Sequence, residues 1–233
     1  MNKNELVIVL LGVIGLFLLD HLISHFLFKE KTIQKEVVLR VIQEHKKQPV
    51  LLSNKVNHLE QLDFEQIVRK MNEIEASNTH NKINRCGFIG AFQVGVAVLE
   101  DSGLVKKGEF KRMKRMNIRQ KDFVLNHLQW KNGYYIYTFL NDFNLQKKVF
   151  ISLCKRNYKI LKRGGYISDT DDINYVRGAI FASHLIGVGA TKRFLSGKKG
   201  NYTDANNVSA LTYFRIGYYL NQKISKSIRF SQL

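Results

Sequence analysis

The sequence predicts a mainly α-helical domain behind an N-terminal transmembrane helix. The 233 residues contain one proline, Pro49, which favours long helices over a many-turned β-sandwich. Hydrophobic residues make up 45% of the chain, enough for a buried core. Strand-like alternation is scarce, and its best candidate, residues 133–139 (GYYIYTF), is short and aromatic. A chain of this length accommodates one well-buried domain plus an appendage.

Residues 1–28 are the predicted membrane anchor. Residues 6–19 form an uncharged apolar run, which continues to Phe28 with one break at Asp20-His21. The whole is close to the roughly 20 residues that a spanning helix needs. Phe26-Leu27-Phe28 and Lys29 follow the run in place of a small-residue cleavage site, so we expect a retained anchor rather than a cleaved signal peptide. A buried core helix is the alternative.

Charge alone leaves the membrane orientation open. Lys29, Lys31 and Lys35 outnumber Lys3, which by the positive-inside rule keeps the bulk of the chain in the cytoplasm. A short N-terminal tail can also stay inside while the remainder is exported. Residues 29–60 are interpreted as a stalk or connecting helix, with a first helix of the domain as the alternative, and residues 61–233 as the main domain.

The net charge of +18 predicts a polyanionic partner such as nucleic acid, anionic lipid or an acidic cell-wall polymer. Lys and Arg are spread along the chain, with only a modest cluster at 106–119, whereas a nucleic-acid interface concentrates basic and aromatic residues on one element. We therefore expect no nucleic-acid partner. Cys86 and Cys154 lack metal-ligand spacing, so neither a metal nor another cofactor is predicted, and a disulfide or two free thiols both remain open.

An amphipathic helix is predicted between Asp63 and Glu75. Glu75 continues its apolar face, because it lies four residues beyond Met71. Glu73 points about 200° away from Glu75 at roughly 100° per residue, so we expect it in solvent. The apolar face itself consists of Phe64, Ile67, Val68, Met71 and Ile74.

A carboxyl group on an apolar wall is expected to have a raised pKa, because burial disfavours its charged form. A raised pKa suits a general acid that works near neutral pH. The alternatives for Glu75 are an ion pair with one of the many Lys or Arg residues and a plain loop cap.

The loop after this acid resembles a known enzyme family. Gly87 and Gly90 lie 12 and 15 residues beyond Glu75, and Gly90 opens the segment Gly-Ala-Phe-Gln that ends at Gln93. This pattern resembles the lytic transglycosylases with a lysozyme-like fold, in which a catalytic Glu precedes Gly-Ala-x-Gly-Leu-Met-Gln with the same two glycine offsets. It is closer still to their phage-tail and secretion-associated branch.

Two later segments extend the resemblance over about residues 64–219. Residues 179–190 (AIFASHLIGVGA) are similar to the late helix of the family, and residues 203–209 (TDANNVS) to a D-A-N-G-T-S segment of the same branch. The chain departs from the family at two places. Ala76 follows the acid, where the family has a Ser, and Ser183-His184 stands where many members have Tyr-Asn. These departures leave substrate contacts near His184 open.

The resemblance implies a lysozyme-like domain that cleaves the MurNAc–GlcNAc β-1,4 bond of peptidoglycan and forms 1,6-anhydroMurNAc. Glu75 would be the catalytic acid and then the base. The domain would lie in the periplasm on an inner-membrane anchor, with peptidoglycan strands and secretion-apparatus proteins as partners. The residues expected to contact substrate are Gly90, Phe92, Gln93, Ser183, His184 and Asp204.

Each of these residues has a plainer alternative. Gln93 offers a donor and an acceptor to an acetamido group and Phe92 a flat face to a sugar ring, but both could simply open the next helix. For His184 the pattern favours a core histidine, and for Asp204 it favours a turn or cap before the last helix. Asp171-Asp172 could supply the second carboxylate of a hydrolase, although a cap on a helix starting near Ile173 is favoured.

Three other functions remain open. They are a hydrolytic lysozyme-type muramidase, a non-catalytic peptidoglycan-binding scaffold, and a cytoplasmic-facing protein that binds nucleic acid at the membrane.

Overall fold

The computed structural model describes residues 57–131, 133–204 and 206–221, all within one compact unit, residues 52–233. The predicted anchor and most of the predicted stalk lie outside these residues. None of the helices in the described ranges has the length and apolarity that a bilayer crossing requires. The described residues form helices and isolated β-bridges but no strand, which confirms the mainly α-helical class.

The helices follow one another in chain order. They are α2 (His58–Gln61), α3 (Phe64–Ala76), α4 (Val96–Asp101), α5 (Glu109–Arg115), α6 (Gln120–Leu125), the 3₁₀ turn η1 (His127–Gln129), α7 (Ile136–Asn141), α8 (Phe143–Arg163), α9 (Ile173–Leu195) and α10 (Ala210–Tyr218). Asp63 and Asp142 accept hydrogen bonds from the first turns of α3 and α8, as N-cap residues do.

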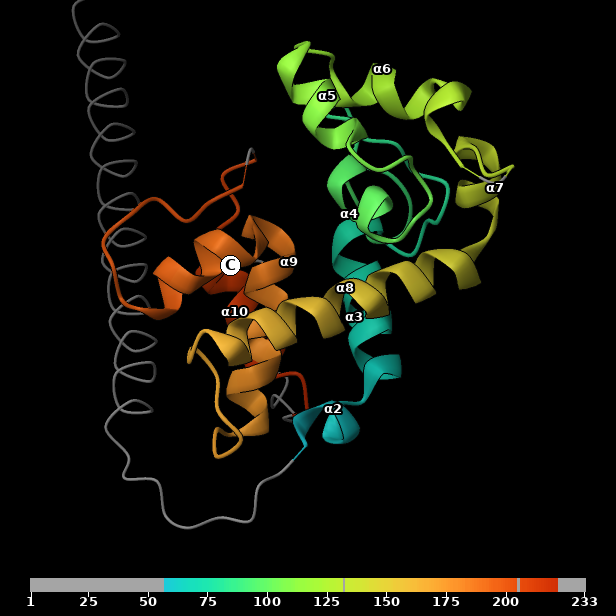
Figure 1. Ribbon diagram of the computed structural model, residues 1–233. Coiled ribbons are helices and arrows are strands. Elements are labelled where there is room, and N and C mark those ends of the chain that lie inside the picture. Colours follow the sequence, from blue (N-terminus) through green and yellow to red (C-terminus); the bar gives the residue numbers. More distant parts are fainter. Residues whose placement is uncertain (1–56, 132, 205, 222–233) are drawn as a thin grey trace, which may run out of the picture. The chain divides into compact units, whose positions relative to one another are not determined.

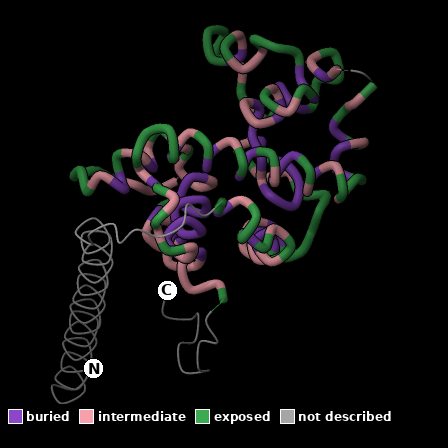
Figure 2. Tube along the Cα trace, turned by 60° about the horizontal axis from the view of Figure 1, so that its bottom comes forward, coloured by how far each residue is buried: buried purple, intermediate pink, exposed green. Residues whose placement is uncertain are grey.

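The long helix α8 connects two groups of helices (Figure 1). The shorter helices α4 to α7 gather toward its N-terminal end, and α9 and α10 pack toward its C-terminal end, while α3 crosses it. Buried segments line the inside of both groups (Figure 2). The stacked rings of Phe92 and Phe150, 4.4 Å apart, join the loop before α4 to α8.

Helices α9 and α10 lie close together because glycines face the neighbouring chain. A Cβ on Gly178 of α9 would come within 2.9 Å of Phe214, and one on Gly217 of α10 within 2.7 Å of the Arg177 carbonyl oxygen. The absence of side chains at these two positions therefore lets the backbones approach. This contact fixes where α10 carries Tyr213.

The strand considered for residues 133–139 is a helix, α7, which begins at Ile136. Its buried residues Ile136, Phe139 and Leu140 follow the i, i+3, i+4 spacing of one helix face. The aromatic and β-branched composition favoured a strand, but burial of this face against α8 decides the structure.

The predicted late helix at residues 179–190 lies within α9, which continues to Leu195 across a break at Gly187. Gly187 has φ 74° and ψ 152°, outside the helical region. The hydroxyl of Thr191 donates a hydrogen bond to the Gly187 carbonyl, which ties the second part of the helix to the break. His184 therefore lies on the last turn of the first, regular part of α9.

Candidate functional site

Helix α3 forms as predicted and buries one of its two C-terminal acids. Ile67, Val68 and Met71 lie in the core, and the helix ends at Ser77, which adopts the left-handed conformation with φ 51°. The side chain of Glu75 is 14% exposed. Glu73 is 55% exposed and pairs with Lys70, 2.9 Å away, so the predicted difference between the two acids is confirmed.

Two side chains from distant helices hold the Glu75 carboxylate. The Tyr213 hydroxyl of α10 donates a hydrogen bond to Oε1 at 2.7 Å. Nε2 of His184, on α9, lies 3.1 Å from the same Oε1. Oε2 takes part in neither interaction. The site therefore brings together three helices, α3, α9 and α10, around one carboxylate oxygen.

His184 is nearly enclosed, with 6% of its side chain exposed. The Phe150 ring of α8 meets it edge-on, with ring centres 5.4 Å apart and planes at 86°. Its Nδ1 atom is buried and has no hydrogen-bond partner among the described residues. The only protein group that its ring nitrogens reach there is the Glu75 carboxylate.

The pKa of Glu75 lies below its ordinary value of 4.5, whereas the sequence predicted a rise. Burial raises this pKa, as expected, and is the largest single influence. The hydrogen bond and charge of His184, the hydrogen bond from Tyr213 and the charge of Lys82 together outweigh burial. The prediction failed because the donors on α9 and α10 could not be placed beside Glu75 from the pattern of α3.

The two glycines of the motif have the backbone conformations expected of them. Gly87 has φ 82° and Gly90 φ 77°, which residues with side chains rarely adopt. A Cβ on Gly87 would come within 2.3 Å of the Lys121 backbone nitrogen, and one on Gly90 within 2.6 Å of Gln146 Oε1. Each glycine thus lets the loop pack against another part of the domain.

Gln146 of α8 fixes the Gly90 end of this loop. Its Oε1 accepts a hydrogen bond from the Ala91 backbone N–H at 2.7 Å. Its Nε2 donates to the backbone carbonyls of His80, Phe139 and Leu140. Since Gln146 is 1% exposed, these bonds form away from water and hold the loop, α7 and α8 together.

The remaining loop residues of the motif face inward or bond locally. Phe92 is 1% exposed, with its ring against Phe150, so neither ring face is open to solvent. Gln93 is half-buried with φ 43°, and its Nε2 donates to the Gly90 carbonyl. The next helix, α4, begins only at Val96, after an N-cap at Gly95.

The candidate residues in the late segments have structural partners. Ser183 is buried, accepts a hydrogen bond from Asn157 and donates one to the Ile180 carbonyl. The Asp204 carboxylate accepts hydrogen bonds from the backbone N–H groups of Asn206 and Val208, a turn. Asp172 is the N-cap of α9, as the helix-cap interpretation predicted. Of the sequence candidates, only His184 contacts Glu75.

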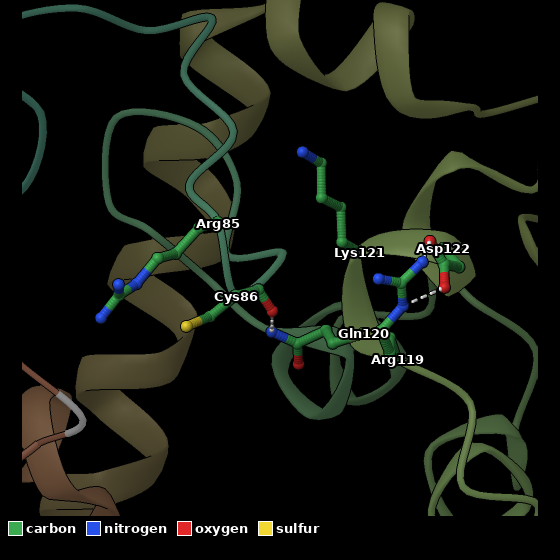
Figure 3. A pocket seen from close by; sticks show the side chains of 6 residues that line it. All are labelled: Arg85, Cys86, Arg119, Gln120, Lys121 and Asp122. Carbon is green, nitrogen blue, oxygen red and sulfur yellow. Dashed lines mark hydrogen bonds and ion pairs between the residues drawn. The ribbon is translucent and has the colours of Figure 1, made fainter.

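A separate open pocket of about 440 Å³ lies between the loop and the start of α6 (Figure 3). Gln120 donates a hydrogen bond to the Cys86 carbonyl across it, and Arg119 pairs with Asp122 through two hydrogen bonds. In Figure 3 the Arg85 and Lys121 side chains extend in different directions, so their charges do not converge on one point. The pocket is lined by Arg85, Cys86, Arg119, Gln120, Lys121 and Asp122.

The two cysteines are free thiols, Cys154 in the core and Cys86 partly exposed. Among the described residues no group of three His, Cys, Asp or Glu side chains is arranged to hold a metal ion. At Glu75 the described residues place one carboxyl group with two fixed neighbours, an arrangement that can transfer a proton.

Tyr213 and Gln146 are the site residues that the sequence did not reveal. Tyr213 lies 138 residues after Glu75, and Gln146 lies 55 residues after the Ala91 N–H that it binds. No local pattern marks either residue. The sequence could indicate that these residues lie on buried helix faces, but burial does not identify a hydrogen-bond partner.

Comparisons of the chain with protein families, with curated proteins and with solved structures find no match.

Proposed function

We propose that the domain is a lytic transglycosylase with a lysozyme-like fold that cleaves the MurNAc–GlcNAc β-1,4 bond of peptidoglycan. The observation that carries the proposal is the Glu75 carboxyl group, 14% exposed and bonded by Tyr213 and His184 at one oxygen only. It does not lie in bulk solvent, and no guanidinium group among the described residues pairs with it. The motif that follows, with Gly87 and Gly90 at positive φ, adds the resemblance in sequence.

In the proposed reaction, Glu75 first donates a proton to the glycosidic oxygen. The bond from the MurNAc anomeric carbon to that oxygen breaks, and an oxocarbenium-like centre develops on MurNAc. The Glu75 carboxylate then takes the proton of the MurNAc C6 hydroxyl as its oxygen bonds the anomeric carbon. The 1,6-anhydro ring closes, no water is consumed, and Glu75 recovers its proton.

The lowered pKa of Glu75 determines which step its surroundings favour. Tyr213 and His184 stabilise the carboxylate, the form that the first step produces. Fewer molecules then carry the proton at neutral pH, but each proton is donated more readily. We therefore expect cleavage to speed up as the pH falls toward the pKa of Glu75.

Asp172 and Asp204 are the acids that the hydrolytic alternative would draw on. A hydrolytic glycosidase of the usual kind needs a second carboxylate within about 10 Å of the first. Asp172 lies twelve residues before His184 on the regular part of α9, or about 18 Å at 1.5 Å per residue. Asp204 is engaged in its own turn. The preference for a transglycosylase over a muramidase follows the family resemblance, and the products of the reaction distinguish the two.

The proposed substrate also decides the proposed location. Peptidoglycan lies outside the inner membrane, so residues 1–28 would anchor the chain there with the N-terminus inside and the domain in the periplasm. The net charge of +18 would hold the domain near the polyanionic wall. The resemblance to the secretion-associated branch adds local wall opening for a trans-envelope secretion machine as the biological role, by analogy.

Muropeptide analysis tests the proposed reaction. Sacculi digested with the full-length protein should release products one water lighter than hydrolytic products, as anhydro ends require. Glu75→Gln should abolish them. Glu73→Gln, two residues away on the same helix but exposed, is the matched control and should cleave like the wild type.

The other outcomes identify the alternatives. Products that carry the mass of one added water would show hydrolysis, as by a muramidase. Sacculi that bind the protein but stay uncut, with wild type and Glu75→Gln alike, would show a scaffold. A reporter active only in the periplasm, fused to the C-terminus, should be active, and an inactive reporter would support the cytoplasmic, nucleic-acid-binding alternative.

A further inference from the structure

We propose that His184 is a positioning residue for Glu75: with Tyr213 it occupies Oε1, so that Oε2 is the oxygen that gives and takes the substrate proton. This inference rests on the proposed function of Glu75. It assigns His184 a role different from substrate contact or simple core packing.

The position of the histidine proton follows from the surroundings of the two ring nitrogens. Nε2 lies 3.1 Å from Glu75 Oε1, within hydrogen-bond reach. Nδ1 is buried and has no partner among the described residues, so a proton there would be a buried N–H without an acceptor. The surroundings therefore favour the tautomer that carries its proton on Nε2, and this N–H donates to Oε1.

The two donors also determine which oxygen of the Glu75 carboxyl group carries the proton. With both donors in place, Oε1 accepts hydrogen bonds from Tyr213 and His184, and a proton on Oε1 would displace one of them. The proton of the carboxylic acid therefore resides on Oε2, which neither donor uses. A carboxyl group held in this way presents one oxygen, in one orientation, for both proton transfers.

Other charged groups and one aromatic ring surround Glu75 and His184. Lys82, from the loop after α3, acts on Glu75 through its charge. Asp204, before α10, acts through its charge on Tyr213. From α8, the Phe150 ring packs against His184 and carries no charge. Of these groups, Tyr213 and His184 contact the Glu75 carboxylate directly. Replacing His184 by Gln keeps an N–H donor at this position but removes the charge.

Two substitutions separate the positioning role from packing. His184→Phe keeps a ring of similar shape against Phe150 and removes the donor. His184→Gln keeps an N–H at nearly the same distance along the side chain. In the full-length protein, the pKa of Glu75 is measured from its ¹³C-labelled carboxyl signal, assigned by its loss in Glu75→Gln. The pH profile of glycan cleavage is measured on the same variants.

The expected result is a rise in the pKa of Glu75 in His184→Phe, and a smaller rise in His184→Gln, which keeps the donor but not the charge of His184. The alkaline limb of the cleavage profile should move upward further in His184→Phe than in His184→Gln. An unchanged pKa and an unchanged limb in His184→Phe would overturn the proposal and leave His184 as a core histidine.

A measurement on the wild type covers the case in which His184→Phe does not fold. The ¹⁵N shifts of the His184 ring should show a protonated Nε2, and an unprotonated Nε2 would overturn the proposal. The cleavage assay and the NMR signals test the proposed function and the role of His184 separately. A wild type without cleavage contradicts the proposed function, while the ¹³C and ¹⁵N signals still decide whether His184 holds Oε1.

Discussion

The loop between α3 and α4 borders two polar regions that differ in burial and in how firmly their charged side chains are held. At its start, the Glu75 carboxylate is largely buried and bonded by residues of two other helices. Further along, Arg85 and Cys86 border an open pocket (Figure 3), and its cationic side chains are exposed. The first region has one charge in a defined orientation, and the second has several charges without one.

The exposed cations at the pocket thus lie apart from the largely buried, oriented Glu75 carboxylate. Exposed cations attract polyanions but are screened by salt and cost little to move. A buried carboxylate with fixed donors has a shifted pKa and one available oxygen, which proton transfer requires. Substitutions near Glu75 should therefore have large effects, and substitutions at the pocket small ones.

The largest effect is expected for Gly90→Ala, which should destabilise the domain by roughly 2–5 kcal/mol. The new Cβ would meet the buried Gln146 at 2.6 Å, in addition to the strain of φ 77°. Gly103→Ala is the matched control, because Gly103 has a similar φ of 75° and open space around it. The control should lose only about 1–2 kcal/mol. Urea unfolding measures both, and equal losses would refute the packing argument.

Gln146→Leu should destabilise the domain by about 2–4 kcal/mol. The substitution leaves the Ala91 N–H and the Phe139 and Leu140 carbonyls without their buried partner. Exposed Gln61 offers the control substitution Gln61→Leu, which should change stability by less than about 0.5 kcal/mol. Thermal unfolding compares them, and a stable Gln146→Leu variant would show that the loop does not depend on these bonds.

Tyr213→Phe should slow glycan cleavage about 10-fold at the pH optimum, because the carboxyl group loses a bond that orients it, and should raise the pKa of Glu75. It removes the 2.7 Å hydrogen bond to Oε1 and keeps the ring in place. Tyr137→Phe, at an exposed tyrosine, is the control and should cleave normally. The initial rate of anhydro-product release is the measurement. A Tyr213→Phe variant as fast as the wild type would show that His184 alone suffices to hold the carboxylate.

A smaller effect is expected on stability at acidic pH. The pKa of Glu75 is lowered in the folded protein, so the unfolded chain binds more protons and stability rises with pH. This contribution is fully present above the ordinary value of 4.5 and is lost as the pH falls through the lowered folded pKa. Urea unfolding between about pH 7 and pH 3 should show a flatter decline for Glu75→Gln than for the wild type. A steeper decline would reverse the sign.

The smallest effects are expected at the pocket. Arg85→Ala and Lys121→Ala should each change the free energy of unfolding by less than about 0.5 kcal/mol, because both side chains are exposed. They should weaken retention on sacculi at low ionic strength and leave it unchanged at high salt. A co-sedimentation assay across salt concentrations measures this. Loss of binding at every salt concentration would show that the pocket makes specific contacts.

The sequence predicted what depends on neighbours along the chain. The apolar face of α3 placed Glu75 in the interior and Glu73 in solvent, and the glycine offsets marked two positions of positive φ. The helix cap at Asp172 followed from the acids before Ile173. These features are decided within a few residues, by periodicity and by backbone conformation.

The sequence could not predict what depends on distant contacts. The direction of the Glu75 pKa shift is set by His184 and Tyr213, which no local pattern pairs with it. Phe92 suggested a sugar platform by its place in the motif, yet the core takes its ring because Phe150 lies beside it. Similarly, the segment around Ile136 is helical because α8 covers its apolar face.

The distance along the chain between Glu75 and Tyr213 has a consequence for biosynthesis. The hydroxyl that completes the site is added 138 residues after the acid, so a nascent chain presents Glu75 long before α10 has left the ribosome. Until then the acid lacks the partner that orients it. A translation product that stops short of α10 therefore lacks the Tyr213 hydrogen bond to Glu75, which forms only once nearly the whole domain has been synthesised.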